Sequence, residues 1–516
     1  MLRLRRAYLT LRTIAGVLWL VAGCTVGPNY VRPTVLVPPA YKEMEGWKVA
    51  QPKDETLRGA WWEIFQDPLL NSLEERVNIS NQNLAAAEAQ VRQAQAAVQA
   101  ARASYFPTLS IGASVINSRQ PTSLGGGAPT RHAVTNFSLP LQASWELDLW
   151  GRIRRTVESQ EASAEASQAD LESARLSAQD TLAQSYFALR VLDAQRQLLD
   201  ATVADYQKAL ELTQNRYASG VASRADVVQA DTQLKTAQAQ AIDVGVQRAQ
   251  LEHAIVTLVG TPPSDFSLSM APLTAVPPAI PVGVPSELLE RRPDIAAAER
   301  QVAATNAQIG VAVAGYFPTL TLSGSAGFLS TSLSDLFTWP SRAWAVGASI
   351  AETVFEGGLR RAQTDEARAA YDATVATYRQ VVLTAFQAVE DNLAALRILE
   401  EETRVQDEAV KAAEQSVTLT TNQYKAGTVS YLNVITAQTI ALTNEVAKVQ
   451  ILGRRMAATV LLIDALGGGW NVSTLRSANV RGGNDSEGPQ SSEGKPIPVD
   501  RSRVTASSQS QESVGK

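Results

Sequence analysis

The phrase YFPTL appears twice in the sequence, in ASYFPTLS at residues 103–110 and in AGYFPTLT at residues 314–321. Two further pairs of segments repeat in the same order, namely LWGRIRR (149–155) with FEGGLRR (355–361), and NRYASGVASRADV (215–227) with NQYKAGTVSYLNV (422–434). Matched segments in one order indicate an internal duplication with a period of about 200 residues, far longer than the repeats of solenoid proteins. The chain is therefore predicted to contain two copies of one structural half.

In each copy the repeated phrase marks a change from helix to strand. Residues 66–103 are rich in alanine and glutamine, which is typical of a helix. Pro107 ends this helix, because the residue before a proline is pushed towards extended backbone. From Leu109 to Val115, apolar residues alternate with small or polar ones. This period of two predicts a strand with one apolar face.

The same alternation predicts one more strand in the first copy and two in the second. It covers residues 137–149, 320–328 and 344–350, although Pro140 weakens the first of these because proline lacks an amide donor. Each copy thus supplies a hairpin of strands roughly ten residues long, the length that a tilted strand needs to cross a bilayer. Aromatic residues lie near the strand ends, as an interfacial belt requires: Trp145, Trp150, Phe328, Trp339 and Trp344.

An alternative explanation exists for these hairpins. A soluble hairpin packed on a core would show the same alternation, but the long helices beside the strands and a predicted lipid anchor favour a membrane.

Four strands cannot close a barrel, and their outer edges would leave unpaired amides in hydrocarbon. The strands must therefore be shared between subunits. Two chains would give eight strands, nearly filled by side chains, whereas three would give twelve and an open lumen.

Residues 151–219 are predicted to form one helix of roughly 100 Å, because neither proline nor glycine occurs between Gly151 and Gly220. A heptad pattern predicts a coiled-coil seam along it, with Arg196 as a polar exception. The seam positions are Leu182, Leu189, Val203, Leu210 and Tyr217, with Ser185, Leu192, Leu199, Tyr206 and Thr213 three residues further on.

Each long helix is predicted to turn back at a glycine. The segment ASGVAS breaks the first helix at Gly220, and residues 224–259 return as an antiparallel partner. In the second copy, KAGTVS around Gly427 separates residues 359–425 from residues 431–466. Helical pairs this long cannot bury themselves in a globule and must project from it. A soluble fibrous coiled coil would explain these helices but not the strands.

The N-terminus is predicted to be a signal peptide followed by a lipid anchor. Four arginines precede a short apolar stretch, residues 14–22, which is much shorter than the ~20 residues of a membrane-spanning helix. The segment VAGC at residues 21–24 resembles a bacterial lipobox, in which cleavage leaves an acylated N-terminal cysteine. Cys24 is the only cysteine in the chain. It is therefore predicted to carry lipid, palmitate included, and Thr25 in place of aspartate favours the outer membrane.

Composition excludes several classes of function. The net charge of −5 gives no reason to expect a nucleic-acid partner. One cysteine and two histidines, His132 and His253, supply neither an internal disulfide nor a zinc cluster. No arrangement of nucleophile and base is visible, so the chain is predicted not to be an enzyme and to need no cofactor. Residues 290–294 are predicted to form ion pairs and helix caps instead of a reaction centre.

Several segments together carry a family resemblance. They are GCTVGPNYVRP (23–33), WW (61–62), YFPTL twice, ELDLWGRIRR (146–155), LLERRPDIAAAE (288–299) and ALGGGW (465–470). This sequence resembles the TolC-like outer-membrane factor efflux channels, in their lipoprotein (NodT-type) branch, from Cys24 to Trp470. The resemblance implies an α+β fold with four β-strands per chain. It further implies a homotrimer with a 12-stranded outer-membrane barrel and a long periplasmic α-helical barrel.

The resemblance also implies partners and docking positions. A periplasmic adaptor and an inner-membrane pump would deliver drugs, dyes, detergents or other amphiphiles to the channel. The implied adaptor-docking tips are Gly220, Val221, Ala222 and Ser223 in the first copy and Gly427, Thr428, Val429 and Ser430 in the second. Glycine suits a left-handed turn, so these residues also have a purely structural explanation.

The periplasmic aperture is where the sequence departs from the family. Several relatives carry an acidic ring just beyond the second tip, but the matching residues here are the uncharged Asn433 and Thr436. In the first copy Asp226 matches Asn433 and would supply charge instead. Arg224 and Tyr424 are further candidates for contacts at the aperture.

The predicted domains are a signal peptide (1–23), a lipid-anchored extended segment (24–60), a first repeat (61–260), a Pro-rich crossover (261–285), a second repeat (286–470) and a disordered tail (471–516). The predicted function is the exit channel of a tripartite efflux system, anchored in the outer membrane and extending into the periplasm. Two alternatives stay open: the channel of a type I protein secretion system, and a lipid-anchored coiled-coil protein without a pore.

Overall fold

A computed structural model of the chain describes residues 25–43, 59–119, 133–273, 275–278, 280 and 288–470. All of them belong to the first of two compact units, residues 1–472. The predicted signal peptide, Cys24, His132 and the tail from residue 471 lie outside the described residues.

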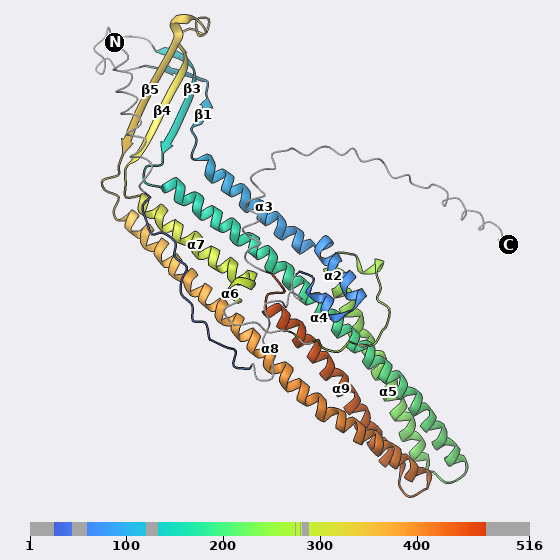
Figure 1. The fold of residues 1–516 in the computed structure, drawn as a ribbon. Helices are drawn as coiled ribbons and strands as arrows, with labels where there is room; N and C mark the ends of the chain where they lie inside the picture. Colours follow the sequence, from blue (N-terminus) through green and yellow to red (C-terminus); the bar gives the residue numbers. More distant parts are fainter. Residues whose placement is uncertain are drawn as a thin grey trace, which may run out of the picture. The chain divides into compact units, whose positions relative to one another are not determined.

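The described unit combines long helices with one antiparallel sheet (Figure 1). Its helices are η2 (Trp61–Phe65), α2 (Pro68–Ser80), α3 (Gln82–Ala103), α4 (Arg152–Ala218), α5 (Arg224–Leu258), η3 (Pro263–Asp265), α6 (Leu288–Arg291), α7 (Pro293–Ala314), η5 (Trp339–Ser341), α8 (Leu359–Lys425) and α9 (Tyr431–Ala465). Its strands are β1 (Thr108–Ile111), β2 (Ser114–Ser118), β3 (Val134–Leu147), β4 (Thr319–Ser330) and β5 (Arg342–Ala351). The predicted α+β class is confirmed.

The single helix predicted over residues 66–103 is wrong, because the chain breaks at Asn81. The Asn81 side chain accepts hydrogen bonds from the amides of Asn83 and Leu84 and so caps α3. Its own amide group donates to the carbonyl of Leu258 at 2.8 Å. Asp67 caps α2 in the same way, with Pro68 in the first turn. The break thus fastens two helices to the end of α5.

The strands pair in the order β1-β3-β4-β5, with β2 beside β3 (Figure 1). Leu141 of β3 lies opposite Ala326 of β4, which lies opposite Trp344 of β5. Because this register keeps the predicted apolar positions opposite one another, the apolar residues of both repeats share one face of the sheet. The serine and glutamine positions share the other face.

Pro140 explains why the strand predicted from Leu109 to Val115 is split into β1 and β2. Gly112 donates to the Pro140 carbonyl at 3.1 Å, but Pro140 has no amide hydrogen to donate in return. Ile111 pairs with Leu141 and Val115 with Phe137, so the register is the same on both sides of the gap. One backbone hydrogen bond between the strands is therefore missing at Pro140. The predicted apolar face is kept, because the register does not change.

Helices α4 and α8 each span 67 residues, or roughly 100 Å. α4 begins shortly after β3 ends, so the sheet and the turn into α5 lie at opposite ends of α4 (Figure 1). Most of the predicted seam is buried, including Leu182, Leu189 and Leu199. Tyr217 is 48% exposed in the single chain, so its seam position stays a prediction. Among the described residues, no helix is long and apolar enough to cross a membrane.

The main hydrophobic core lies halfway along the helices. It joins Trp61 and Phe65 of η2, α2, and the crossover residue Leu268 to the middle of α4 and α8. An N-terminal strap, residues 25–43, runs along the helices, from the start of α4, where the Val26 amide donates to the Trp150 carbonyl at 3.1 Å, to the middle of α8. Within it Arg32 donates to the Tyr378 hydroxyl at 3.3 Å, and the Glu43 carboxylate pairs with Arg397 at 2.7 Å. We call these segments together the belt: the strap, η2, α2 and crossover residues 261–280.

Candidate functional site

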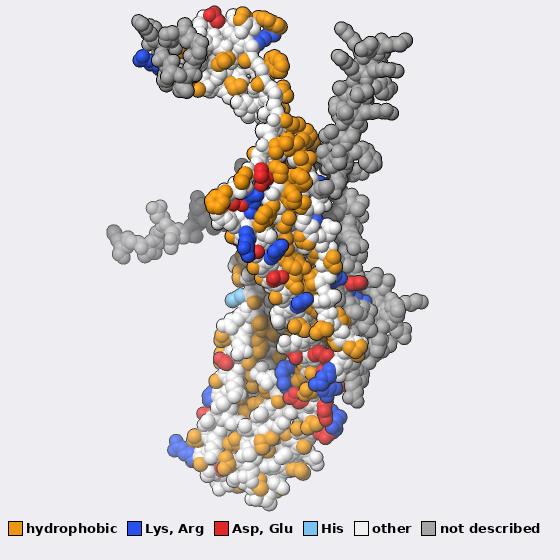
Figure 2. All heavy atoms as spheres, turned by 90° about the vertical axis from the view of Figure 1, so that its left-hand side faces the viewer, with side chains coloured by type: hydrophobic (Ala, Val, Ile, Leu, Met, Phe, Trp, Pro, Cys, Tyr) orange, Lys and Arg blue, Asp and Glu red, His pale blue; other side chains and the backbone are white. Residues whose placement is uncertain are grey.

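The sheet exposes an apolar face with few charges. On β5 the alternate residues Trp344, Val346 and Ile350 are 79%, 80% and 73% exposed. The strands of the described sheet carry charged residues only at Glu146 and Arg342, both near strand ends. Figure 2 shows hydrophobic side chains over the sheet at the top of the view, with few charged groups among them. Such a surface suits hydrocarbon better than water.

Tryptophans fasten both YFPTL phrases where helices become strands. The Trp145 indole donates to the Tyr105 carbonyl at 2.9 Å, at the end of α3. In the second phrase, Trp150 donates to the Pro318 carbonyl at 2.8 Å and stacks on Phe317 with ring centroids 4.8 Å apart. The repeated phrase thus provides the corner at which each helix enters the sheet.

Both edges of the described sheet are open. β5 pairs only with β4, and β1 and β2 pair only with β3, among the residues that the structure describes. Every residue of β1, β2 and β5 is exposed. Rows of unpaired amides and carbonyls therefore line two sides of a surface suited to hydrocarbon, where they are costly.

The first helix tip is a tight turn at residues 219–223. Gly220 has φ of 74°, a conformation that favours glycine, and its amide donates to the Tyr217 carbonyl at 2.9 Å. Ser223 and Asp226 cap each other at the start of α5, because each side chain accepts the other's backbone amide. The Asp226 carboxylate, a predicted aperture group, therefore also holds this turn together.

The second tip has the same backbone but weaker capping. Gly427 has φ of 78°, and Thr428 bonds the Gln423 carbonyl through both its amide and its hydroxyl. Ser430 makes no side-chain cap to the backbone and instead contacts Asn433, at 3.3 Å. The hydroxyl of Thr436 donates to the Leu432 carbonyl within α9. The remaining predicted tip residues, Val221, Ala222 and Val429, lie in the two turns.

Arg216 joins the two tips. Its guanidinium donates to the Lys425 carbonyl at 3.0 Å and lies 4.7 Å from the centre of the Tyr424 ring. Tyr424 in turn packs on Tyr431, and burial raises the pKa of Tyr431 to about 12. Arg216 was not among the residues predicted from the sequence, although its place in the last turn of α4 was visible there.

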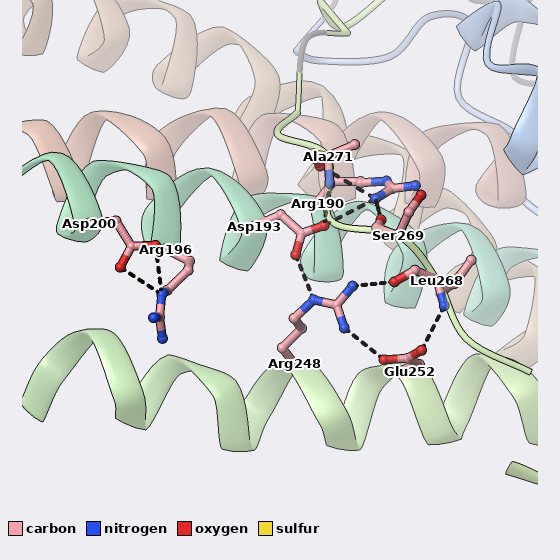
Figure 3. Close-up of polar contacts among 9 residues, drawn as sticks. All are labelled: Arg190, Asp193, Arg196, Asp200, Arg248, Glu252, Leu268, Ser269 and Ala271. Carbon is pink, nitrogen blue, oxygen red and sulfur yellow. Dashed lines mark hydrogen bonds and ion pairs between the residues drawn. The ribbon is translucent and has the colours of Figure 1, made fainter. Parts of the chain in front are cut away.

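A polar clamp fastens the crossover to α4 and α5 (Figure 3). Buried Asp193 of α4 pairs with Arg190 at 3.0 Å and with Arg248 of α5 at 2.7 Å. These groups also hold the crossover backbone, through the carbonyls of Leu268 and Ser269 and the amide of Ala271. Because Asp193 is fully buried, its two arginine partners are needed to stabilise its charge.

Buried acids lie where the belt packs on α4. Glu74 of α2 is fully buried, both its carboxylate oxygens lack a hydrogen-bond partner, and burial with the nearby Asp180 raises its pKa to about 9. Burial and Asp464 raise the pKa of Asp180 to about 7. In the part of the chain that the structure describes, no cluster of three histidine, cysteine, aspartate or glutamate side chains has a geometry for a metal ion.

The other predicted features have structural roles. Arg292 pairs with Asp294 at 2.6 Å and donates to the Ala465 carbonyl at 3.0 Å, as the prediction of ion pairs and caps at residues 290–294 requires. His253 lies on α5.

Comparison with known proteins gives a consistent result. The family model described as outer membrane efflux protein matches residues 74–261 and again 284–468, once for each repeat. The pyoverdine export outer membrane protein OpmQ of Pseudomonas aeruginosa is 33% identical over 80% of this chain and 87% of its own length. The toluene efflux pump outer membrane protein TtgI of Pseudomonas putida is 32% identical over 88% and 97%. The solved outer-membrane channel OprN matches 87% of this chain and 100% of its own with a TM-score of 0.80 and 32% identity.

Proposed function

The chain belongs to the outer membrane efflux protein family and is an outer-membrane efflux channel that extends into the periplasm, and from this premise we propose that three copies share one wall around a water-filled duct. One observation carries the proposal: a sheet with an apolar face has two open edges in each chain. Edge-to-edge pairing of identical chains satisfies both rows of amides at once. Three chains provide twelve rows of strands, enough for an open lumen.

The wall continues from the sheet into the helices. β3 leads into α4 and β5 into α8, so each strand pair extends as a helical pair of roughly 100 Å. The family expectation of an acylated Cys24 adds an anchor at the outer membrane. The adaptor would meet the two glycine tips and connect the channel to the pump. We expect the solutes to be drugs or other small amphiphiles, in keeping with relatives named for toluene efflux and pyoverdine export.

Purified full-length protein tests this proposal in two ways. Chemical crosslinking in detergent should end at a trimer, and planar bilayers should show discrete single-channel conductance. A stable monomer without conductance would exclude the duct and favour a coiled-coil protein that forms no pore.

A second assay separates small-molecule efflux from protein secretion. Deletion of the gene should sensitise the cells to dyes and detergents while their secreted proteins stay unchanged. The opposite result would support a channel for protein secretion.

A further inference from the structure

A groove of about 880 Å³ runs along α4 between α5 and α9, just below the main core. Ala188 and Leu192 of α4 line it, Gln247 belongs to the α5 side, and Ala447 and Gln450 belong to the α9 side. Its volume lies within the range of about 300 to 1,000 Å³ that small-molecule sites have. All of the lining residues described here come from one chain.

The groove lies on the face of α4 away from the belt. Tyr186 donates to Asp67 before α2 at 2.5 Å, and Arg190 and Asp193 hold the crossover, as Figure 3 shows. Groove residue Ala188 is two positions from Tyr186, and Val191 is two positions from Asp193; two residues turn a helix by about 200°. The belt contacts and most of the α4 residues of the groove therefore lie on opposite faces of α4, whereas Phe187 lines the groove and also packs on Phe65 of η2. In the proposed duct the belt must lie on the outer face, because it would fill the lumen if it lay inside. The groove, on the other face of α4, then faces the lumen.

The groove has a mixed chemical lining. Glutamine amides, which both donate and accept hydrogen bonds, come from α4, α5 and α9, and they surround apolar side chains such as Val191 and Leu192. Gln184 is bonded to Asp180, whereas Gln195, Gln247 and Gln450 make no hydrogen bond to another described residue. The charged pair Arg454 and Glu402 neutralises itself at 2.6 Å. The lining therefore offers apolar contact and amide hydrogen bonds but no net charge.

Gly453 fixes the α9 wall of the groove. A β-carbon at this position would come 2.7 Å from Cγ2 of Val191, so only glycine allows α9 to lie this close to α4. The groove is thus a consequence of the packing of α9 on α4, with α5 on the far side.

We propose that this groove binds neutral or zwitterionic amphiphiles as they pass through the lumen, with their apolar part on Ala188 and Leu192 and their polar part on the glutamine amides. This inference rests on the proposed duct. It assigns a solute site to the channel wall, distinct from the tips and the aperture. Binding there must be weak enough for release, so we expect affinities in the micromolar range.

The test uses full-length trimers in lipid nanodiscs and the neutral fluorescent amine N-phenyl-1-naphthylamine, with empty nanodiscs as background. Ala188→Trp fills the exposed floor of the groove, and Ala447→Phe narrows it from α9. Ala204→Trp, at an exposed alanine of α4 outside the groove, is the matched control. We expect saturable binding of one probe per chain, which both groove variants weaken by about tenfold or more and the control leaves unchanged.

Equal binding by the wild type and both groove variants would overturn the inference, and so would an equal loss in the control. Single-channel conductance of the same preparations separates this inference from the duct itself. A protein that conducts without a saturable site overturns the solute site alone. A protein that does not conduct overturns the proposed function and this inference with it.

Discussion

At the scale of single residues, the buried acids are the groups whose environment departs most from water. Glu74 is fully buried with its oxygens unpartnered, and its pKa of about 9 means that it is protonated in the folded protein at neutral pH. Protonation is a cost, because the carboxyl of the unfolded chain would be ionised above its ordinary pKa of 4.5. The folded state therefore binds a proton that the unfolded state releases, and stability falls as pH rises.

We predict that Glu74→Gln removes much of this pH dependence. The wild type should lose stability between about pH 4.5 and 9 through Glu74, and between about pH 4 and 7 through Asp180. At pH 7 the substitution should stabilise the fold by on the order of 3 kcal/mol, since glutamine is never charged. Thermal unfolding at pH 5.5 and 8.5, followed by circular dichroism, measures the effect. Glu75→Gln, at the exposed neighbouring position, should leave the slope unchanged.

The tip glycines give a second prediction at this scale. A side chain at Gly220 meets no atom within 4 Å, so Gly220→Arg causes backbone strain at φ of 74° but no clash. We expect trimers to reach the outer membrane and conduct normally, while efflux of a dye falls by about tenfold or more because the docking surface is lost.

Gln214→Arg, at an exposed position of α4 more than a turn from the tip, is the control. Normal efflux in the Gly220 variant would refute the docking assignment.

At the scale of elements, strand alternation and helix-breaking residues predicted most of the helices and strands. The period of two identified the apolar face, and the glycines identified both helix turns, because each is a local property of the sequence. The break at Asn81 was missed although its cap on α3 is local; only its bond to Leu258, far away in the sequence, could not be predicted from it. Likewise, nothing near Glu74 in the sequence reveals that Asp180 lies beside it. Partners from other elements decide such features, so a single sequence does not contain them in readable form.

The two faces of β5 give a prediction for this scale. Val346→Lys places a charge on the apolar face, which should cost about 2 to 4 kcal/mol in the bilayer and lower the amount of assembled trimer. Ser349→Lys places the same charge on the opposite face, towards water, and should be tolerated. Quantitative immunoblots of outer-membrane fractions compare the two. Equal loss of trimer in both variants would contradict the assigned orientation of the sheet.

At the scale of the whole molecule, Arg216 connects the two repeats at their far ends. It is bonded to the Lys425 backbone and stacked on Tyr424, so separation of the two helical hairpins must break both contacts. The belt clamps the same helices halfway along. We therefore expect any opening of the periplasmic end to require the Arg216 contact to break.

We predict that Arg216→Met weakens the contact between the two helical hairpins and favours opening of the periplasmic end. Loss of one hydrogen bond and one cation–π contact, worth about 1 to 2 kcal/mol together, should raise the open probability about tenfold. Single-channel recordings measure this probability directly. Lys235→Met removes an exposed positive charge on α5 without breaking the contact and should behave as the wild type. If both variants raised the open probability equally, loss of positive charge, and not loss of the Arg216 contact between the hairpins, would explain the effect.

The unequal capping of the two tips has a consequence for any assembly that docks onto them. The first turn is fixed by the reciprocal Ser223 and Asp226 bonds and carries an acid, whereas the second has the neutral Asn433 and no such cap. Three chains would then present six helix tips. Tips with the reciprocal cap and an acid would alternate with tips that lack this cap and are neutral. Six identical molecules binding from the periplasm would therefore meet two classes of tip, three of each class. The complex would look nearly sixfold symmetric but would have only threefold symmetry.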